Sequence, residues 1–331
     1  MSTKKKFDIK ANPVYTFFSK NIILIALIVL GIALSIATDR FLTVNNITNV
    51  LLQSATTGLV AVGMTYVIIT GGIDLSVGSV VALASALGAG TMKDLMEVIP
   101  VGWAVAIGIV IMLIVGAIVG FLQGLLISRL RMPAFIVTLA GMSIARSLTM
   151  VYTGGMTIAA LPDEFAKIGS DRIGDWLPVP VIVMVVIFLL AFYVLQYTAF
   201  GRSLYALGGN REATKLSGIN TTLIETITYS ISGLTAGFAA IILTARLATA
   251  TSTAGEGYEL EAIGAVVIGG ASLAGGRGTM LGTFIGVLIL GVLNNGQNLL
   301  NVDPFFKGSI HGAVILIAVL IDTLKKRNEV N

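Results

Sequence analysis

Long stretches without any charged residue follow one another along almost the whole chain. They cover residues 21–38, 41–73, 75–92, 98–128, 132–145, 147–162, 176–200, 226–245, 262–276, 278–302 and 308–321. A helix needs about 20 mostly apolar residues to cross the hydrocarbon core of a bilayer. Backbone groups in lipid must be hydrogen-bonded within their own segment, and a membrane β-barrel would alternate apolar and polar residues. The continuous stretches therefore predict membrane-spanning helices.

The pattern predicts an all-α, polytopic membrane protein with about ten transmembrane helices. The expected helices cover residues 20–38, 47–70, 75–92, 100–127, 133–152, 180–197, 223–246, 259–273, 279–297 and 306–323. No loop between them is long enough to fold as a separate domain. We therefore expect one membrane domain at 20–325, preceded by a basic segment at 1–19 and followed by a short tail at 326–331.

Basic residues indicate the orientation of these helices. If both termini are cytoplasmic, the outside loops hold only a minority of the Lys and Arg residues, namely Arg40, Lys93, Lys167, Arg172 and Lys307. Cytoplasmic loops of membrane proteins carry an excess of Lys and Arg. This bias predicts that both termini are cytoplasmic, and it also explains the net charge of +4.

Composition and missing motifs exclude most kinds of chemistry. Only 11% of the residues are charged, 56% are apolar, cysteine is absent and His311 is the single histidine. Disulfides, thiol catalysis and cysteine-ligated metals are excluded, and no metal site is expected. The chain has no phosphate-binding G-x-x-x-x-G-K-[ST] loop, no H-E-x-x-H and no G-x-S-x-G motif. We expect that it is not an enzyme and binds no cofactor itself.

A glycine-rich motif at 71–79 interrupts the apolar pattern. Gly71 and Gly72 permit a sharp turn or close helix contact, and Asp74 lies between two long uncharged stretches. An ionisable group there is costly unless it is paired or hydrated. Gly71, Gly72, Asp74 and Ser76 are therefore candidates for a gate or pathway at the inner end. Alternatively, Asp74 caps a helix that starts at Leu75, with help from Ser76.

The same spacing occurs a second time. Residues 71–78 and 269–276 share the pattern G-G-x-x-L-x-x-G. Transporters often contain repeats with interrupted helices at matching positions. In a chain with 38 glycines, chance could also produce this echo.

A short amphipathic helix is predicted in the largest inside loop. Asn210 is a suitable N-cap, and Gly218 a suitable C-terminal stop. Ala213 and Leu216 would share one face. This face either rests on lipid headgroups or docks a soluble motor protein. The candidate segment comprises Asn210, Arg211, Glu212, Ala213, Thr214, Lys215, Leu216, Ser217 and Gly218.

Two arginines and an amide cluster are further candidates. Arg246 near a helix end is expected to reach the membrane interface, whereas Arg146 lies deeper and is a pathway candidate. Asn294, Gln297 and Asn298 have the spacing that places side chains on one helix face. They could bind sugar hydroxyls, or they could bond neighbouring helices.

Acidic residues gather at the predicted outer end of the eighth helix. Glu256, Glu259 and Glu261 cluster there beside Tyr258, an aromatic residue of the type found at membrane interfaces. Glu256, Tyr258 and Glu259 are candidates for docking a soluble partner. They could equally form an ordinary solvated loop.

At these motifs the chain resembles the membrane permeases of bacterial ABC sugar importers, in the branch that serves ribose, xylose, galactose and related monosaccharides. The resemblance covers about residues 20–325. It rests on I-T-G-G-I-D-L-S-V-G-S at 69–79, Y-A-L-G-G-N at 205–210, L-S-G-I-N at 216–220, G-Y-E-L at 257–260 with A-I at 262–263, S-L-A-G-G at 272–276 and L-N-N-G at 293–296.

The resemblance implies a permease that moves a monosaccharide, with ribose expected, through the bacterial cytoplasmic membrane. It also implies a second permease copy, a tandem cytoplasmic ATPase that uses ATP and Mg, and a periplasmic or lipid-anchored sugar-binding protein. Membrane lipid is expected as a partner and nucleic acid is not. Residues 210–218 would form the coupling helix that sits in a cleft of the ATPase. The alternative is a secondary transporter or channel driven by an ion gradient, which needs ionisable groups near the midplane, where Arg146 is the one candidate.

Overall fold

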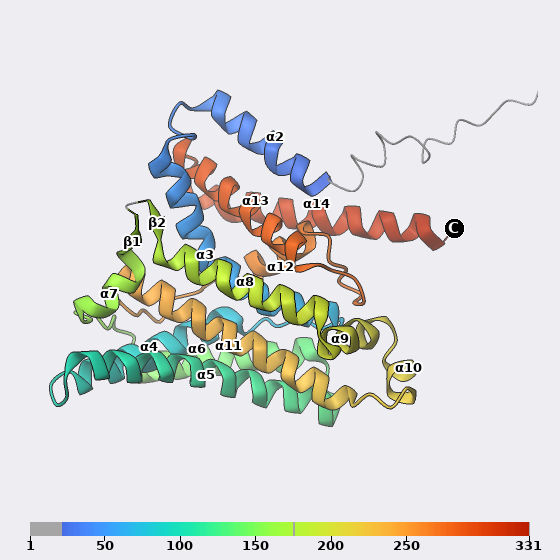
Figure 1. Ribbon diagram of the computed structural model, residues 1–331, viewed down its shortest axis with the longest axis horizontal. Helices are drawn as coiled ribbons and strands as arrows, with labels where there is room; N and C mark the ends of the chain where they lie inside the picture. The colour runs from blue at the N-terminus through green and yellow to red at the C-terminus, as the bar shows by residue number, and fades with distance from the viewer. Residues whose placement is uncertain (1–21, 175, 331) are drawn as a thin grey trace, which may run out of the picture.

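The computed structural model describes residues 22–174 and 176–330, so the predicted basic segment at 1–19 and the last residue of the tail lie outside the described residues. The described chain is a bundle of helices with one small hairpin (Figure 1). Its elements are α2 (Ile22–Ala37), α3 (Val44–Ile69), α4 (Val77–Leu95), α5 (Val101–Leu130), α6 (Ala134–Thr153), α7 (Asp163–Ser170), β1 (Arg172–Ile173), β2 (Leu177–Pro178), α8 (Val179–Tyr197), α9 (Ala199–Gly209), α10 (Arg211–Leu216), α11 (Thr221–Leu247), α12 (Tyr258–Ile268), α13 (Met280–Leu299) and α14 (Pro304–Val330).

Each of the predicted membrane helices corresponds to a helix in the structure. Within the described residues, six are long and apolar enough to cross a membrane: α3, α5, α6, α8, α11 and α13. The apolar parts of α2 and α14 are shorter, and α12 has 11 residues. The all-α membrane fold is thus confirmed, while the number of crossings stays a prediction.

Most predicted helix ends lie within three residues of the observed ones, and three differences have a structural meaning. The helix expected at 259–273 ends at Ile268, because Gly270 adopts a left-handed conformation (φ +87°) that stops it. The helix expected from residue 75 begins at Val77. The predicted tail from residue 326 is helical through Val330, as a continuation of α14.

The two ends of the bundle carry different short elements. One end holds α7 and the β1–β2 hairpin, and the other holds α9 and α10 (Figure 1). We call them the α7 end and the α10 end. The α10 end is the one predicted to face the cytoplasm.

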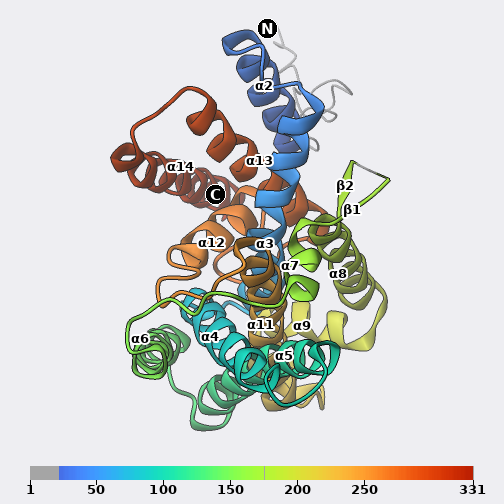
Figure 2. The same ribbon diagram turned by 90° about the vertical axis from the view of Figure 1, so that its left-hand side faces the viewer.

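Helices α3 and α11 lie at the centre of the bundle (Figure 2), and the order of their contacts along the chain shows that they are antiparallel. Gly63 of α3 packs against Ser232 of α11, and nearer the α7 end Arg246 donates to the carbonyl oxygen of Leu52 at 3.2 Å. The guanidinium of Arg246 thus bonds a backbone carbonyl of α3, and its reach to the membrane interface stays a prediction. In α3 every residue from Ser54 to Ile69 is buried.

The helices that follow α3 and those that follow α11 pack in the same pattern, but the two sets run in opposite directions. Helix α5 packs along α11 and α13 packs along α3, while α4 lies on α5 and α12 lies on α13. Small residues allow the closest approach: a Cβ on Gly116 would lie 2.2 Å from the carbonyl oxygen of Gly233, and one on Gly286 would lie 2.0 Å from that of Ala265. The units α3–α4–α5 and α11–α12–α13 are thus related as inverted repeats.

Each repeat contains a non-helical segment that turns back into the bundle. Residues 70–76 leave α3 at the α10 end, and residues 248–257 leave α11 at the α7 end. The two segments nevertheless converge, since a Cβ on Gly78 would lie 2.2 Å from the carbonyl oxygen of Gly255. Helices α4 and α12 therefore begin inside the bundle. The structural equivalent of segment 70–76 is therefore segment 248–257, and not the repeated glycine motif at 269–276.

Candidate functional site

The short helix predicted at the α10 end is present with its expected caps. Asn210 accepts a hydrogen bond from the backbone N–H of Ala213 at 3.0 Å, which is the bond of an N-cap. Gly218 adopts a left-handed conformation (φ +80°), and its N–H donates to the carbonyl oxygen of Lys215 at 3.0 Å. The sequence thus predicted both ends of α10 correctly.

The apolar face of α10 points away from the bundle. Leu216 is 88% exposed and Ala213 is also exposed, whereas Thr214 is buried and donates to the carbonyl oxygen of Asn210 at 2.8 Å. A large apolar side chain so exposed on a short polar helix is available for contact with another molecule. Glu212, Lys215 and Ser217 share this exposed surface.

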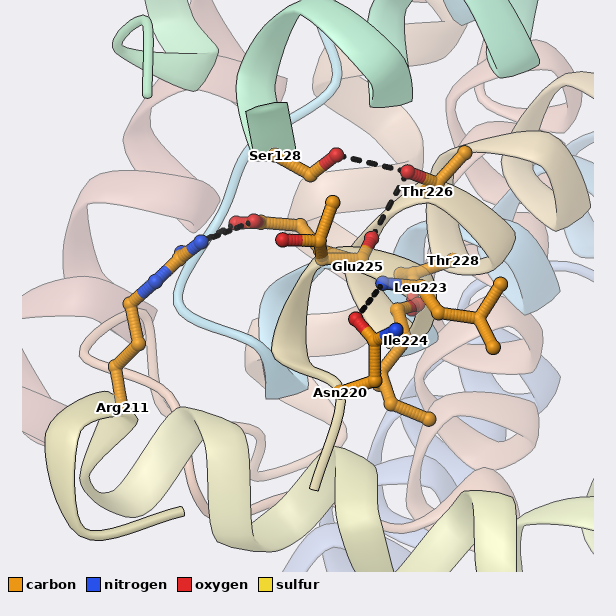
Figure 3. A network of polar contacts seen from close by, with 9 residues as sticks. Ser128, Arg211, Asn220, Leu223, Ile224, Glu225, Thr226 and Thr228 are labelled. Carbon is orange, nitrogen blue, oxygen red and sulfur yellow. Dashed lines mark hydrogen bonds and ion pairs between the residues drawn. The ribbon is translucent and has the colours of Figure 1, made fainter. Parts of the chain in front are cut away.

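A bidentate ion pair ties α10 to α11. Arg211 donates from Nη1 and Nη2 to the two carboxylate oxygens of Glu225, at 2.9 and 2.7 Å (Figure 3). The hydrogen bond to Glu225 raises the pKa of Arg211 above its usual value. Beside it, Ser128 of α5 and Thr226 of α11 share a hydrogen bond of 2.8 Å (Figure 3). The ion pair therefore fixes the start of α10 to the first turns of α11.

The sequence interpretation missed Glu225 as a partner of Arg211. The signal was present, because Glu225 is the last charge before the uncharged stretch at 226–245. An isolated acid at the start of a membrane helix requires a partner or water. The nearest basic residues in the preceding loop are Arg211 and Lys215.

Both glycine motifs meet α9 at the α10 end. The N–H of Gly276 donates to the carbonyl oxygen of Ile69 at 2.8 Å, and a Cβ on Gly275 would lie 2.9 Å from the backbone nitrogen of Gly71. A Cβ on Gly208 of α9 would lie 1.8 Å from the Ile69 oxygen. Tyr205, also on α9, donates to the carbonyl oxygen of Gly278 at 2.7 Å. Helix α9 therefore contacts the end of α3 and the loop before α13.

Asp74 anchors the returning segment 70–76 and does not cap a helix at Leu75. Its Oδ1 accepts hydrogen bonds from the backbone N–H (3.0 Å) and hydroxyl (2.7 Å) of Ser76, and its Oδ2 accepts one from Ser232 of α11 at 2.8 Å. The Ser76 hydroxyl also lies 3.0 Å from Oε1 of Gln123 on α5. The capping alternative is wrong, because these bonds bind the segment to two other helices and α4 begins only at Val77.

Arg146 holds the other returning segment, residues 248–257, by side-chain hydrogen bonds. Its Nη1 donates to the carbonyl oxygens of Ser252 and Ala254, the latter at 3.0 Å. The bonds hold segment 248–257 against α6. The guanidinium is thus satisfied by backbone carbonyls, as expected for a charge inside a membrane protein.

The candidate docking residues lie on and after this segment. Glu256 is exposed, whereas Tyr258 and Glu259 are partly buried. Glu259 turns towards α4, since a Cβ on Gly78 would lie 2.5 Å from its Oε2. Of the three, only Glu256 presents its side chain outward, and a docking role stays a prediction.

The predicted amide cluster divides into two parts. Asn294 and Asn298 line one cavity, in which Asn298 accepts a hydrogen bond from Lys307 at 2.5 Å. Gln297 is buried and does not line that cavity, so the three amides do not form one exposed polar surface. Asn295, which was not singled out, forms two reciprocal hydrogen bonds with Asn46 of α3 at 2.9 and 2.8 Å.

Cavities occupy both ends of the bundle. At the α10 end, a cavity of about 350 Å³ is bounded by Gly71, Gly72, Arg131 and the Arg211–Glu225 pair. At the α7 end, cavities of about 410 and 370 Å³ lie between α3, α12, α13 and α14. The buried part of α3 separates the two ends. In the described ranges, no group of three or more His, Asp or Glu side chains could hold a metal ion.

Comparison with known proteins identifies related chains along nearly the whole length. The profile of a family described as branched-chain amino acid transport system / permease component matches residues 46–319. The ribose import permease protein of Escherichia coli (strain K12) is 47% identical over 307 residues, which are 92% of this chain and 93% of the relative.

Two further relatives agree with this result. The ribose import permease protein of Bacillus subtilis (strain 168) is 48% identical over 305 residues, 91% of this chain and 92% of the relative. A xylose transport system permease protein of Haemophilus influenzae is 33% identical over 367 aligned positions, 92% of this chain and 96% of the relative. No solved structure matches the chain.

Proposed function

The chain belongs to the family of branched-chain amino acid transport system permease components, and from that premise we propose that it is the ribose-translocating subunit of an ATP-driven importer in the cytoplasmic membrane. The observation that carries the choice of ribose is the identity of 47% with a ribose import permease over 92% of the chain. The xylose permease at 33% supports the broader class of pentoses.

We propose that energy enters through α10 from a separate ATPase, which holds the ATP and Mg. The exposed Leu216 supplies an apolar contact for the ATPase, and the Arg211–Glu225 pair links that contact to α11. The contact of Gly208 with the Ile69 carbonyl links it to α3. A movement of α9 and α10 thus reaches both central helices. In this arrangement the α10 end faces the cytoplasm, and this chain itself hydrolyses nothing.

At the α7 end, a periplasmic or lipid-anchored sugar-binding protein delivers the sugar, with Glu256 in its docking surface. A second copy of the permease completes the complex. Both partners are expected from the importer class, in which a permease works with an ATPase and a binding protein. The permease contacts lipid along its apolar helices and has no role with nucleic acid.

Reconstitution tests this function. The permease is inserted into liposomes together with its partner ATPase and sugar-binding protein, and uptake of radiolabelled ribose is followed. We expect uptake that requires ATP inside the vesicles and survives an uncoupler, and no ATP hydrolysis by the permease alone. Uptake that persists without ATP but stops with the uncoupler would instead establish an ion-driven transporter.

A further inference from the structure

An apolar cavity lies at the α10 end, where the last turns of α8 meet α9 and the first turn of α13. Its walls include Phe192, Leu195 and Tyr197 of α8, Tyr205 of α9 and Leu281 of α13. Leu281 is 63% exposed and Tyr197 is 62% exposed, so the cavity is open to the outside of the bundle. Its volume of about 250 Å³ is below the range of about 300–1,000 Å³ that is usual for small-molecule sites. The cavity therefore suits part of a larger apolar molecule, such as a segment of an acyl chain.

Aromatic side chains gather at the open side of this cavity. The ring of Tyr197 lies edge-on to that of Phe192, with centroids 6.1 Å apart, and the ring of Tyr193 lies 5.6 Å from Tyr197. Tyr193 and Tyr197 are both more than half exposed. Tyrosine side chains are enriched where the hydrocarbon of a bilayer meets the headgroups, because the ring is apolar and the hydroxyl is polar. The cavity thus lies at the level where an acyl chain joins its headgroup.

The three helices that form the walls carry one charged residue, and it is positive. Residues 176–200 and 278–302 are uncharged, and Arg202 is the only charged residue of α9. Arg202 is exposed and precedes Tyr205 by one helical turn, on the same side of α9. Among the residues that the structure describes, no acid pairs with Arg202. The N-terminus of α13, at Met280, adds a partial positive charge beside the cavity. The surroundings therefore complement a negative group attached to an apolar chain.

We propose that this cavity binds a phospholipid with an anionic headgroup. One acyl chain lies in the cavity and the phosphate lies beside Arg202, which is the arrangement of basic lipid sites between membrane helices. The lipid touches the joint at which Tyr205 donates to the carbonyl oxygen of Gly278 at 2.7 Å, so it supports α9 against the start of α13. The inference goes beyond the proposed function, because this ligand is bound by the permease and is not transported.

Quenching by brominated lipids tests the site. The two natural tryptophans are removed by Trp103→Phe and Trp176→Phe, and Phe192→Trp then places one reporter in the wall of the cavity. Phe121→Trp, at an exposed position of α5 that does not line the cavity, is the matched reporter. Each full-length variant is reconstituted in vesicles of phosphatidylcholine and phosphatidylglycerol. Bromine is carried on the acyl chains of one lipid or of the other, at equal mole fractions.

At Phe192→Trp, we expect the association constant from quenching to favour phosphatidylglycerol over phosphatidylcholine about fivefold, which is the effect of one basic residue at an anionic interface. At Phe121→Trp, the two lipids should quench equally. Arg202→Gln should remove the preference at the cavity. Arg129→Gln changes an exposed arginine at the end of α5 and should leave the preference unchanged.

Three results would overturn the inference. One is the absence of a preference at Phe192→Trp, or an equal preference at Phe121→Trp, because anionic lipid would then be attracted generally and not to this cavity. Another is a preference that survives Arg202→Gln. The last is a Phe192→Trp reporter that neither lipid quenches, which would show that protein, such as a second permease copy, covers this face.

Native mass spectrometry provides a check that needs no tryptophan substitution. The unmodified permease, purified from vesicles that contain phosphatidylglycerol, should retain one molecule of this lipid, and Arg202→Gln should lose it while Arg129→Gln keeps it. Equal retention by all three would contradict the site. Ribose takes part in neither experiment, so a failure here would leave the proposed function intact.

Discussion

The contact between α9 and the end of α3 can be broken by one methyl group. In Gly208→Ala, the new Cβ would lie 1.8 Å from the carbonyl oxygen of Ile69 and 2.6 Å from the backbone nitrogen of Gly276. Both atoms belong to the backbone, and they are joined by the hydrogen bond of 2.8 Å. Forced overpacking costs about 1–3 kcal/mol, and a lost hydrogen bond adds about 0.5–1.5 kcal/mol. We therefore expect the docking of α9 to weaken by about 2–4 kcal/mol.

The neighbouring glycine supplies the control. A Cβ on Gly209 meets nothing within 4 Å, and its backbone is helical. Gly209→Ala should leave docking unchanged and favour the helix by at most about 1 kcal/mol. Ribose uptake and sugar-stimulated ATPase activity are measured in the reconstituted complex, with the thermal midpoint of the permease as a check on folding.

Gly208→Ala should lower uptake at least about tenfold, since 1.4 kcal/mol corresponds to a factor of ten. The ratio of sugar moved to ATP hydrolysed should fall as well, because the ATPase would then move a loosened helix. If Gly208→Ala and Gly209→Ala behave alike, the contact between α9 and α3 does not carry the coupling.

Three further outcomes follow from the contacts described. Leu216→Asp should abolish co-purification of the ATPase with an unchanged thermal midpoint, because Leu216 is 88% exposed; retained co-purification would exclude α10 as the docking helix. Arg211→Glu should reduce uptake strongly, and adding Glu225→Arg should restore part of it. A double-mutant cycle should give a coupling free energy of about 1 kcal/mol, because the arginine side chain is 38% exposed and water screens the pair. Additive effects of the two substitutions would contradict the pairing. Asp74→Ala should lower the free energy of unfolding by about 2–5 kcal/mol in chemical denaturation, because Ser232 and the Ser76 N–H lose their acceptor. Asp74→Asn keeps an acceptor oxygen and should cost clearly less. Equal losses in the two variants would argue against an anchoring role.

Much of the fold could be predicted because the bilayer imposes a simple rule on sequence. Long uncharged stretches gave the existence and approximate bounds of the main helices, and cap residues such as Asn210 and Gly218 gave the ends of α10. The start predicted for α4 and the end predicted for α12 were wrong, because local hydropathy does not show where a helix begins or stops inside the bundle. Asp74 interrupts the apolar pattern, but the next uncharged stretch begins at Leu75, and hydropathy cannot show that the backbone stays non-helical as far as Ser76.

The site was harder to predict because its bonds join residues far apart in the sequence. Asp74 was identified as costly and in need of partners, but Ser232 lies on another helix and nothing local in the sequence points to it. The amides were recognised on one helix as Asn294 and Asn298, whereas Gln53, which lines the same cavity, comes from another helix. Spacing within one helix reveals a face, and only packing reveals what lies opposite it.

The inverted pairing of the two repeats means that their returning segments are secured by opposite kinds of charge. Segments 70–76 and 248–257 occupy equivalent places in the two halves but enter from opposite sides, one held by Asp74 and the other by Arg146. A carboxylate that accepts from hydroxyls and a guanidinium that donates to backbone carbonyls are not interchangeable, so the two halves cannot exchange their arrangements contact for contact. The duplication thus preserves the path of the backbone, while each half has its own fastening, and we expect substitutions at Asp74 and at Arg146 to loosen different halves of the permease.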